Sequence, residues 1–234
     1  MQCVILAAGR GTRMLPLTNS IPKPLVQIAG KAIIDYIVLA LPPEITELVL
    51  VVGYKAEQIR KHCGDQFYGR KVTYVEQSNH TGGTGDALLQ AKDSIKDKFL
   101  FMYADDLHGS DALQRVVVED HAMLSMVSAN PERFGVLIQN EDGTLKEIIE
   151  KPENPPTSLV NIGGFVVEPE ILNYQPEKSQ TGEVYVTDML TAYASKYPVK
   201  IIKQGVWIPI GYPEDVAKAE SRILSLDEKL NKKC

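Results

Sequence analysis

The chain has 234 residues, of which 44% are hydrophobic and 24% are charged, and its formal net charge is -5. This size suits one α/β domain with one substantial core, and the acidic balance excludes a general attraction to nucleic acid or to an anionic membrane. No apolar run is long enough to span a membrane, no secretory signal is recognisable, and Cys3, Cys63 and Cys234 lack the C-x-x-C spacing of a zinc site. We therefore expect a cytoplasmic protein that acts on small molecules.

Through residues 1–110, apolar runs typical of strands alternate with segments whose apolar residues have helical spacing. The predicted strands are Cys3–Ala7, Glu47–Val52, Lys71–Glu76 and Lys98–Tyr103. The predicted helices between them are Ala32–Leu41, Lys55–Cys63 and Gly85–Lys92. This alternation favours a mostly parallel sheet with helices on both faces, so we predict a Rossmann-like nucleotide-binding half.

The pattern becomes less regular over residues 111–234. The predicted strands are His121–Val127, Gly135–Gln139, Leu145–Glu150 and Val160–Val167. The predicted helices are Glu168–Asn173, Thr187–Lys196 and Pro213–Leu230. We expect a mixed sheet region that closes the site within a single domain of residues 1–234, and a mobile loop over the site at Pro152–Ser158.

The first predicted strand leads into a loop of small residues, LAAGRGTRM at positions 6–14, and PKPL follows at 22–25. Glycine and alanine let the backbone approach a bound group, and loop N–H groups can then meet phosphate oxygens. Arg13 and Lys23 add positive charge where a triphosphate would lie. A dinucleotide-binding turn does not fit, because Met14 stands in place of its third glycine and Pro16 interrupts the helix that should follow. A plain β-turn is the remaining alternative.

These two segments resemble the signature of the sugar-phosphate nucleotidyltransferases, which join a nucleoside triphosphate to a sugar 1-phosphate and release pyrophosphate. The resemblance implies the nucleotidyltransferase fold, an α/β architecture with a Rossmann-like, mostly parallel mixed sheet flanked by helices. Further matches continue as far as Asp215. The resemblance also implies that the nucleotide is held by Leu6, Ala8, Gly9, Gly11, Thr12, Arg13 and Lys23.

Asp105 and Asp106 follow a predicted buried strand, at the end where open α/β sheets bind ligands. The resemblance gives Asp105 the role of holding Mg²⁺, with a simple turn aspartate as the alternative, while Asp106 is expected to cap the helix that begins near Ser110. The family's second metal-binding aspartate falls on Pro209, which has no ligand side chain. Three outcomes stay open: Asp105 holds Mg²⁺ with phosphate oxygens and water, which we favour; another acid such as Asp188 takes part; or catalysis is weak or lost.

Gln77 precedes the small-residue turn Gly82-Gly83-Thr84-Gly85, which leads into a predicted helix. An amide both donates and accepts hydrogen bonds, so it can meet a pyrimidine edge. The resemblance to relatives that use UTP or dTTP implies that Gln77, Gly83 and Thr84 read the base. The alternative is a plain helix start with Thr84 as its N-cap.

Three later segments, Phe134-Gly135-Val136, Ile149-Glu150-Lys151-Pro152 and Asn161-Ile162-Gly163-Gly164, resemble the family's contacts to the sugar phosphate. A fourth, beginning at Glu183, resembles an element that borders the sugar pocket, although its Thr187 could simply cap a helix. The residues that the resemblance assigns to the sugar phosphate are Gly135, Glu150, Lys151, Asn161 and Glu183. Lys151 would neutralise the nucleophilic phosphate so that two anions can approach each other.

These features together predict an enzyme that transfers a nucleotidyl group from a triphosphate, UTP or dTTP, to a hexose 1-phosphate with the help of Mg²⁺. The predicted catalytic residues are Arg13, Lys23, Asp105 and Lys151. Two alternatives stay open: a CTP-dependent enzyme that acts on a nonsugar phosphate, and a noncatalytic nucleotide or sugar-phosphate sensor, which Pro209 would explain. The sequence identifies neither the hexose nor the base, and it leaves open whether the chain forms a homo-oligomer.

Overall fold

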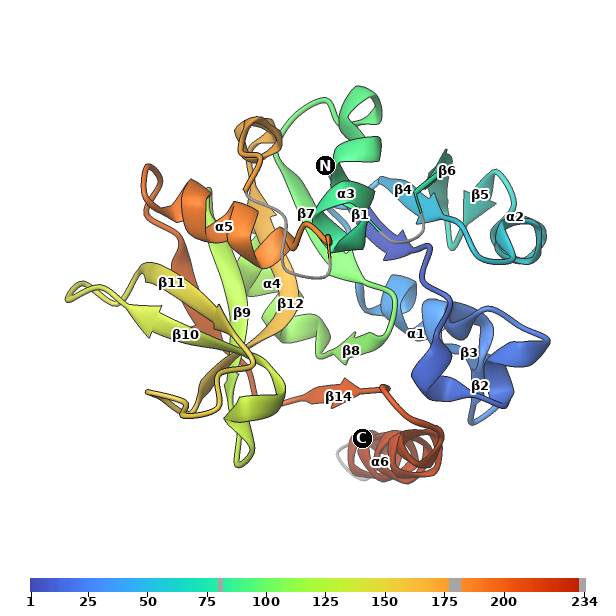
Figure 1. Ribbon diagram of the computed structural model, residues 1–234. Helices are drawn as coiled ribbons and strands as arrows, with labels where there is room; N and C mark the ends of the chain where they lie inside the picture. Colours follow the sequence, from blue (N-terminus) through green and yellow to red (C-terminus); the bar gives the residue numbers. More distant parts are fainter. Residues whose placement is uncertain (80–81, 177–181, 232–234) are drawn as a thin grey trace.

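A central mixed sheet forms the body of the protein in the computed structural model, which describes residues 1–79, 82–176 and 182–231, with side chains up to residue 226 (Figure 1). Its strands are β1 Gln2–Ala7, β4 Glu47–Val52, β5 Gln66–Phe67, β6 Arg70–Glu76, β7 Phe99–Tyr103, β9 Ala122–Val127, β10 Gly135–Gln139, β11 Leu145–Glu150, β12 Leu159–Val167 and β13 Lys200–Lys203. The strand order is β11-β10-β12-β7-β1-β4-β6-β5, while β9 pairs with both β12 and β13.

The first half of the chain supplies the parallel part of this sheet. Strand β1 pairs in parallel with β4 and with β7, and β4 pairs in parallel with β6. Runs such as VILA in β1 and ELVLVV in β4 are rich in β-branched and other apolar residues, as strands that are buried on both faces require. The four strands predicted for this half are confirmed, each to within one residue at its ends.

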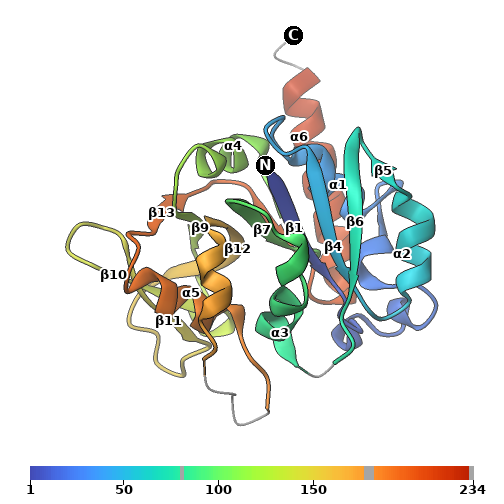
Figure 2. The same ribbon diagram turned by 90° about the horizontal axis from the view of Figure 1, so that it is seen from above.

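Helices cover both faces of the sheet (Figure 2). They are α1 Ile33–Ala40, α2 Ala56–Cys63, α3 Gly83–Gln90, α4 Ser110–Val117, α5 Val186–Ala194 and α6 Pro213–Asn231. Alternate residues of a strand point to opposite faces, so Cys3 and Ile5 of β1 join the core beneath α1, α2 and α4, whereas Val4 joins the core beneath α3 and α5. Two apolar cores, one on each face, therefore hold the strand ends in fixed positions.

The second half of the chain adds antiparallel strands to the same sheet. Strand β12 runs antiparallel to β7, with Phe165 opposite Phe101, and it is also antiparallel to β9 and β10. The register of β12 against β9 shifts between Asn161 and Phe165, where Gly163 and Gly164 have positive φ of 74° and 75°. Glycine tolerates this conformation, so the strand bends where it passes the carboxyl end of β7.

Several features of the fold differ from the sequence prediction, among them the two-residue strand β5, which was not predicted. The helix expected at Glu168–Asn173 is a 3-10 helix over Pro169–Asn173. Strand β13 and two small sheets, β8 Asp106–His108 with β14 Trp207–Pro209 and β2 Gln27–Ile28 with β3 Lys31–Ala32, were not predicted, since two to four residues carry little periodicity. Within the described residues, no helix combines the length and apolar character needed to cross a bilayer.

Candidate active site

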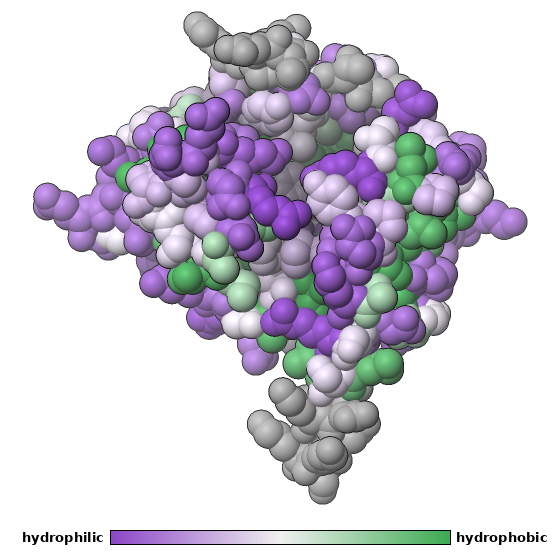
Figure 3. Space-filling view, turned by 60° about the horizontal axis from the view of Figure 1, so that its bottom comes forward, coloured by the Kyte–Doolittle hydropathy of each residue, from purple (hydrophilic) through white to green (hydrophobic). Residues whose placement is uncertain are grey.

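A cavity of about 420 Å³ lies at the carboxyl ends of the parallel strands β1, β6 and β7. The space-filling view shows a hollow in the molecule that is bordered largely by hydrophilic residues (Figure 3). Tight loops and helix starts at these strand ends bring many of the predicted site residues to the cavity. Those that line the cavity are Leu6, Ala8, Gly9, Gly11, Thr12, Arg13, Lys23, Gln77, Gly83, Thr84, Asp105 and Glu183.

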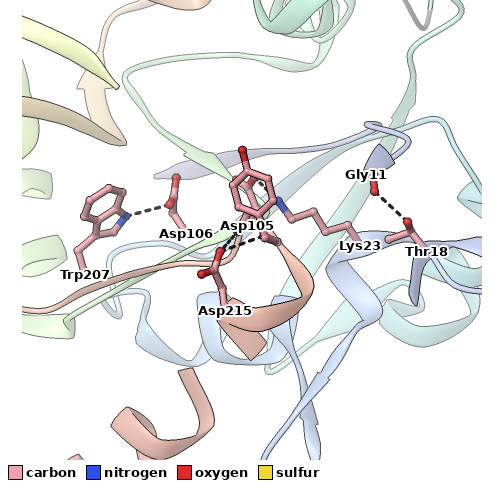
Figure 4. Close-up of polar contacts among 9 residues, drawn as sticks. Gly11, Thr18, Lys23, Asp105, Asp106, Trp207 and Asp215 are labelled. Carbon is pink, nitrogen blue, oxygen red and sulfur yellow. Dashed lines mark hydrogen bonds and ion pairs between the residues drawn. The ribbon is translucent and has the colours of Figure 1, made fainter. Parts of the chain in front are cut away.

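The glycine-rich loop is folded tightly against the segment that follows it. Gly11 has a positive φ of 62°, and a Cβ on it would lie 3.0 Å from the Thr18 methyl group and 3.2 Å from Lys23 Cβ. The Thr18 hydroxyl donates a hydrogen bond of 2.8 Å to the Gly11 carbonyl oxygen (Figure 4). The missing side chain at Gly11 thus lets the loop and Lys23 line the same cavity.

Lys23 and Asp105 form an ion pair at the cavity, with 2.6 Å between Nζ and Oδ2 (Figure 4). The Lys23 side chain is only 11% exposed and that of Asp105 34%, so solvent screens this pair less than a surface pair. Each partner holds the other in place. Among the described residues no hydrogen bond reaches the second oxygen, Oδ1, of Asp105.

Asp106 does not cap a helix, contrary to the sequence prediction, because it begins strand β8. Its Oδ1 accepts a hydrogen bond of 2.9 Å from the Trp207 indole N–H (Figure 4). Burial, and next the charge of Asp105, raise the pKa of the Asp106 carboxyl well above its ordinary value. In the pairing of β8 with β14, Asp106 stands opposite Pro209, the position where the family pattern has its second acid.

The alternative acid, Asp188, lies on α5, where burial raises the pKa of its carboxyl. It is not among the residues that line the cavity, so the fold does not bring it to Asp105. Over residues 1–79, 82–176 and 182–231, no group of three or more His, Cys, Asp or Glu side chains is arranged to hold a metal ion. Asp105 and Glu183 are the two carboxylates among the residues that line the cavity.

The amide of Gln77 lies at the end of β6 and is buried beside the start of α3. Its Nε2 donates hydrogen bonds to Asp86 Oδ2 at 3.0 Å and to the Gly83 carbonyl oxygen at 3.3 Å. Gly83 has a φ of 85°, and a Cβ there would lie 2.6 Å from the Val184 carbonyl oxygen. Only glycine fits this close approach, and the approach brings the segment that carries Glu183 to the cavity.

Thr84 is not the N-cap of α3, since that position belongs to Gly82 and has no side-chain cap. The Thr84 hydroxyl instead accepts a hydrogen bond of 3.0 Å from the Val186 N–H at the start of α5. Thr187, the other proposed cap, lies inside α5, and its hydroxyl has no hydrogen-bond partner in the described part of the chain. Thr84 thus links the first turn of α3 to the first residue of α5 by a hydrogen bond.

Four residues that were predicted to bind the sugar phosphate do not line the cavity: Gly135, Glu150, Lys151 and Asn161. Three of them lie close to one another, because Gly135 is paired with Glu150 across β10 and β11, and a Cβ on Gly135 would lie 3.6 Å from Asn161 Cβ. The ammonium group of Lys151 lies 3.4 Å from Glu150 Oε1, and its side chain is 59% exposed. Residues 152–158 also lie outside the lining, and the predicted mobility of that loop stays a prediction.

Tyr103, which sequence reasoning missed, connects the residues that line the cavity with the group around Glu150. It ends β7 and lines the cavity together with Thr84. Burial, and next the charge of Glu150, raise the pKa of its phenol far above the ordinary value. A Cβ on Gly163 would lie 2.6 Å from the Tyr103 ring, so that glycine makes room for it. The available signal was a polar aromatic residue at a strand end, two positions before Asp105.

Tyr212 is the second residue that sequence reasoning missed. The guanidinium carbons of Arg13 and Arg133 lie 5.5 Å and 5.8 Å from the centre of its ring, within the range of cation–π contacts. The Tyr212 N–H donates to Asp215 Oδ2 at 2.9 Å, and so does the neighbouring N–H of Gly211 (Figure 4). The start of α6 thus holds one ring against arginines from both halves of the chain.

The family model described as nucleotidyl transferase matches residues 2–225. The chain is 35% identical to the UTP–glucose-1-phosphate uridylyltransferase AglF of Haloferax volcanii, over 95% of this chain and 96% of that protein. It is 34% identical to the bifunctional protein GlmU of Methanocaldococcus jannaschii, over 96% of this chain but 54% of that protein, so it spans about half of this relative's length.

Two solved structures show the same fold at 24% identity. One is a UDP-glucose pyrophosphorylase complexed with UDP-glucose, with a TM-score of 0.83 over 96% of this chain and 98% of that one. The other is a putative glucose-1-phosphate thymidylyltransferase from Bacillus anthracis, with a TM-score of 0.82 over 94% of each chain. Both share the mostly parallel sheet flanked by helices, which confirms the predicted fold class. Fold, loop signature and family match agree, and the chain belongs to the nucleotidyl transferase family.

Proposed function

We propose that the protein transfers a nucleotidyl group from UTP or dTTP to a hexose 1-phosphate and releases pyrophosphate. The observation that carries the proposal is a single cavity into which the fold gathers a glycine-rich loop, the cations Arg13 and Lys23, and the carboxylate of Asp105. The similarity to a uridylyltransferase over nearly the full length of both proteins supports this reaction class.

In the proposed reaction an oxygen of the sugar 1-phosphate attacks the α-phosphorus, the new P–O bond forms, and the bond to pyrophosphate breaks. The two substrates repel each other, so the protein has to neutralise charge and hold both groups in line. Arg13 and Lys23 are proposed to hold the triphosphate, with Lys23 fixed by its ion pair with Asp105. Lys151 is proposed to meet the sugar phosphate, which requires its exposed side chain to turn away from Glu150. No side-chain nucleophile is needed.

Asp105 is the residue proposed to hold Mg²⁺. Its carboxylate lines the cavity, and only its Oδ2 is hydrogen-bonded within the described residues. Mg²⁺ commonly takes one or two carboxylates and completes its shell with phosphate oxygens and water, so a single aspartate fits this ion despite Pro209. When bound, the ion would supply charge neutralisation at the phosphate oxygens.

The test is a panel of four nucleoside triphosphates and several sugar 1-phosphates, with and without Mg²⁺, scored by pyrophosphate release. We expect release with UTP or dTTP and a hexose 1-phosphate, and a loss of about 100-fold in kcat/KM for Arg13→Ala. Arg222→Ala, at an exposed position on α6, is the matched control and should retain full activity. Full turnover by the Arg13 variant in folded form would refute the proposal.

Pro209 favours a second candidate, a sensor that binds the same ligands without turnover. Calorimetry with a triphosphate separates the two candidates, because the sensor binds and releases no pyrophosphate under any condition of the panel. A parallel assay replaces the sugar 1-phosphates by a nonsugar phosphate, and pyrophosphate release there with CTP alone would instead support the CTP-dependent enzyme.

We further propose that residues 1–234 act as one cytoplasmic domain, with a nucleotide half at 1–110 and a sugar-phosphate half at 111–234. The antiparallel pairing of β7 with β12 supports this, because one sheet then crosses the boundary between the halves. A single unfolding transition, seen alike by circular dichroism and by Trp207 fluorescence, tests the domain assignment. Cell fractionation tests the location.

A further inference from the structure

The neighbours of the Gln77 amide permit only one orientation. Its Nε2 meets Asp86 Oδ2 at 3.0 Å and the Gly83 carbonyl oxygen at 3.3 Å. A carboxylate and a carbonyl accept hydrogen bonds and cannot donate them, so the NH₂ group has to face both and the carbonyl oxygen Oε1 has to face away. Gln77 lines the cavity, and among the described residues no hydrogen bond reaches Oε1.

Asp86 reaches Gln77 because Gly82 has no side chain. A Cβ on Gly82 would lie 2.4 Å from Asp86 Cγ and 2.5 Å from its Oδ2, closer than atoms approach in proteins. Gly82 is the N-cap of α3 and Asp86 lies in its first turn, so the helix start places the carboxylate beside the end of β6. The contact is therefore built into the junction between this strand and this helix.

We infer that Asp86 is a positioning residue that fixes Gln77 as a hydrogen-bond acceptor toward the base, and that the cavity thereby selects uracil or thymine over cytosine. The inference rests on the proposed function and adds the residue that sets base selectivity. Uracil and thymine carry an N–H at ring position 3 that can donate to Oε1. Cytosine has an unprotonated nitrogen there, so two acceptors would face each other and both would lose a hydrogen bond.

The test compares two substitutions at Asp86 by the ratio of kcat/KM for UTP or dTTP, whichever is preferred, to that for CTP. Asp86→Leu keeps the approximate shape and removes the nearer and charged one of the two acceptors, which leaves the NH₂ group with only the 3.3 Å contact to the Gly83 carbonyl oxygen. Gln77 can then turn its NH₂ toward the base, and we expect the ratio to fall about tenfold through KM. Asp86→Asn keeps an acceptor and loses the charge, so we expect the ratio to stay within about threefold of the wild type. Asp93→Leu, at an exposed position in the 3-10 helix Lys92–Ser94, is the control.

A purely structural role of Asp86 in the first turn of α3 predicts a different result, since loss of helix stability lowers all activities together and leaves the ratio unchanged. An unchanged ratio in a folded Asp86→Leu protein, or equal falls in both Asp86 variants, would overturn the inference. Gly82→Ala provides a second route if Asp86→Leu does not fold, because it displaces the carboxylate and should lower the ratio in the same way; an unaltered ratio there counts against the inference.

The wild type separates failure of the inference from failure of the proposed function. Absence of pyrophosphate release with every triphosphate refutes the function. Release with CTP as good as with UTP and dTTP leaves nucleotidyl transfer in place and refutes the role of Asp86. Calorimetric titration of UTP, dTTP and CTP gives the same comparison without turnover.

Discussion

Replacing His108 by glutamine should make the protein more resistant to acid. His108 lies in β8, three residues after Asp105, and is 6% exposed. Its Nδ1 lies 2.8 Å from Gln204 Nε2, so that amide donates to the imidazole. Burial lowers the pKa of His108 from 6.5 to about 3, with a smaller opposing effect from the charge of Asp105. Glutamine offers an acceptor to Gln204 and carries no titratable group.

The direction and size of the effect follow from the proton balance. The imidazole is neutral in the folded protein but becomes protonated below pH 6.5 in the unfolded chain, so acid favours unfolding. The free energy of unfolding falls by about 1.4 kcal/mol for each pH unit below that value, which gives about 2.7 kcal/mol at pH 4.5. For a chain of this length that corresponds to about 5–11 °C in melting temperature.

Thermal denaturation of both proteins from pH 7.5 to pH 4.5 measures this effect. The quantity compared is the difference in the free energy of unfolding between the two proteins at each pH, so the contributions of the other titrating groups cancel. We expect the His108→Gln protein to gain about 2.7 kcal/mol relative to the wild type between the two ends of the range. A difference that stays constant to within about 0.5 kcal/mol would refute a neutral buried histidine, given the 1.4 kcal/mol per pH unit expected.

Three other substitutions test features of the fold and the site. Gly163→Ala forces a side chain into a φ of 74° and to within 2.6 Å of the Tyr103 ring, so we expect a loss of about 1–3 kcal/mol in thermal melts and a lower kcat/KM. Tyr212→Ala removes the ring between two arginines and should raise the KM for the triphosphate several-fold with little change in kcat; steady-state kinetics with unaltered KM would contradict it. Tyr193→Phe leaves the Glu168 N–H without its hydroxyl acceptor at 3.1 Å, and a loss of about 1–2 kcal/mol is expected in denaturant titrations.

The sequence predicts the parallel half of the fold well because β1, β4 and β7 are largely apolar runs of five or six residues and the helices between the strands have regular spacing. The same rule explains why the site could be located. In parallel α/β sheets the strand ends meet at one edge, so Arg13, Gln77 and Asp105, each a few residues beyond a strand, converge in one cavity. Hydrophobic periodicity could not reveal β8 and β14. Each strand has only three residues, and the two strands that pair with each other are about 100 residues apart in the sequence.

Side-chain direction is the part that the sequence could not supply. Lys151 follows β11 as predicted, yet its ammonium group pairs with Glu150 instead of lining the cavity. Asp106 was assigned to a helix cap because it precedes Ser110, but the indole of Trp207 binds its carboxyl from a segment 101 residues away. Such contacts depend on which distant elements the two cores bring together, and spacing along the chain does not encode that.

The segment from Trp207 to Asp215 shows how the chain departs from the family pattern without losing its architecture. The Ile210 N–H donates to the Asp105 carbonyl oxygen at 3.0 Å, and the N–H groups of Gly211 and Tyr212 are held by Asp215. None of these bonds uses the side chain at position 209, so proline there removes an acid while the backbone stays against the site. In the proposed reaction the substitution would act on the charge available to the phosphates and to Mg²⁺, so we expect turnover to depend on Asp105 and on its ion-pair partner Lys23.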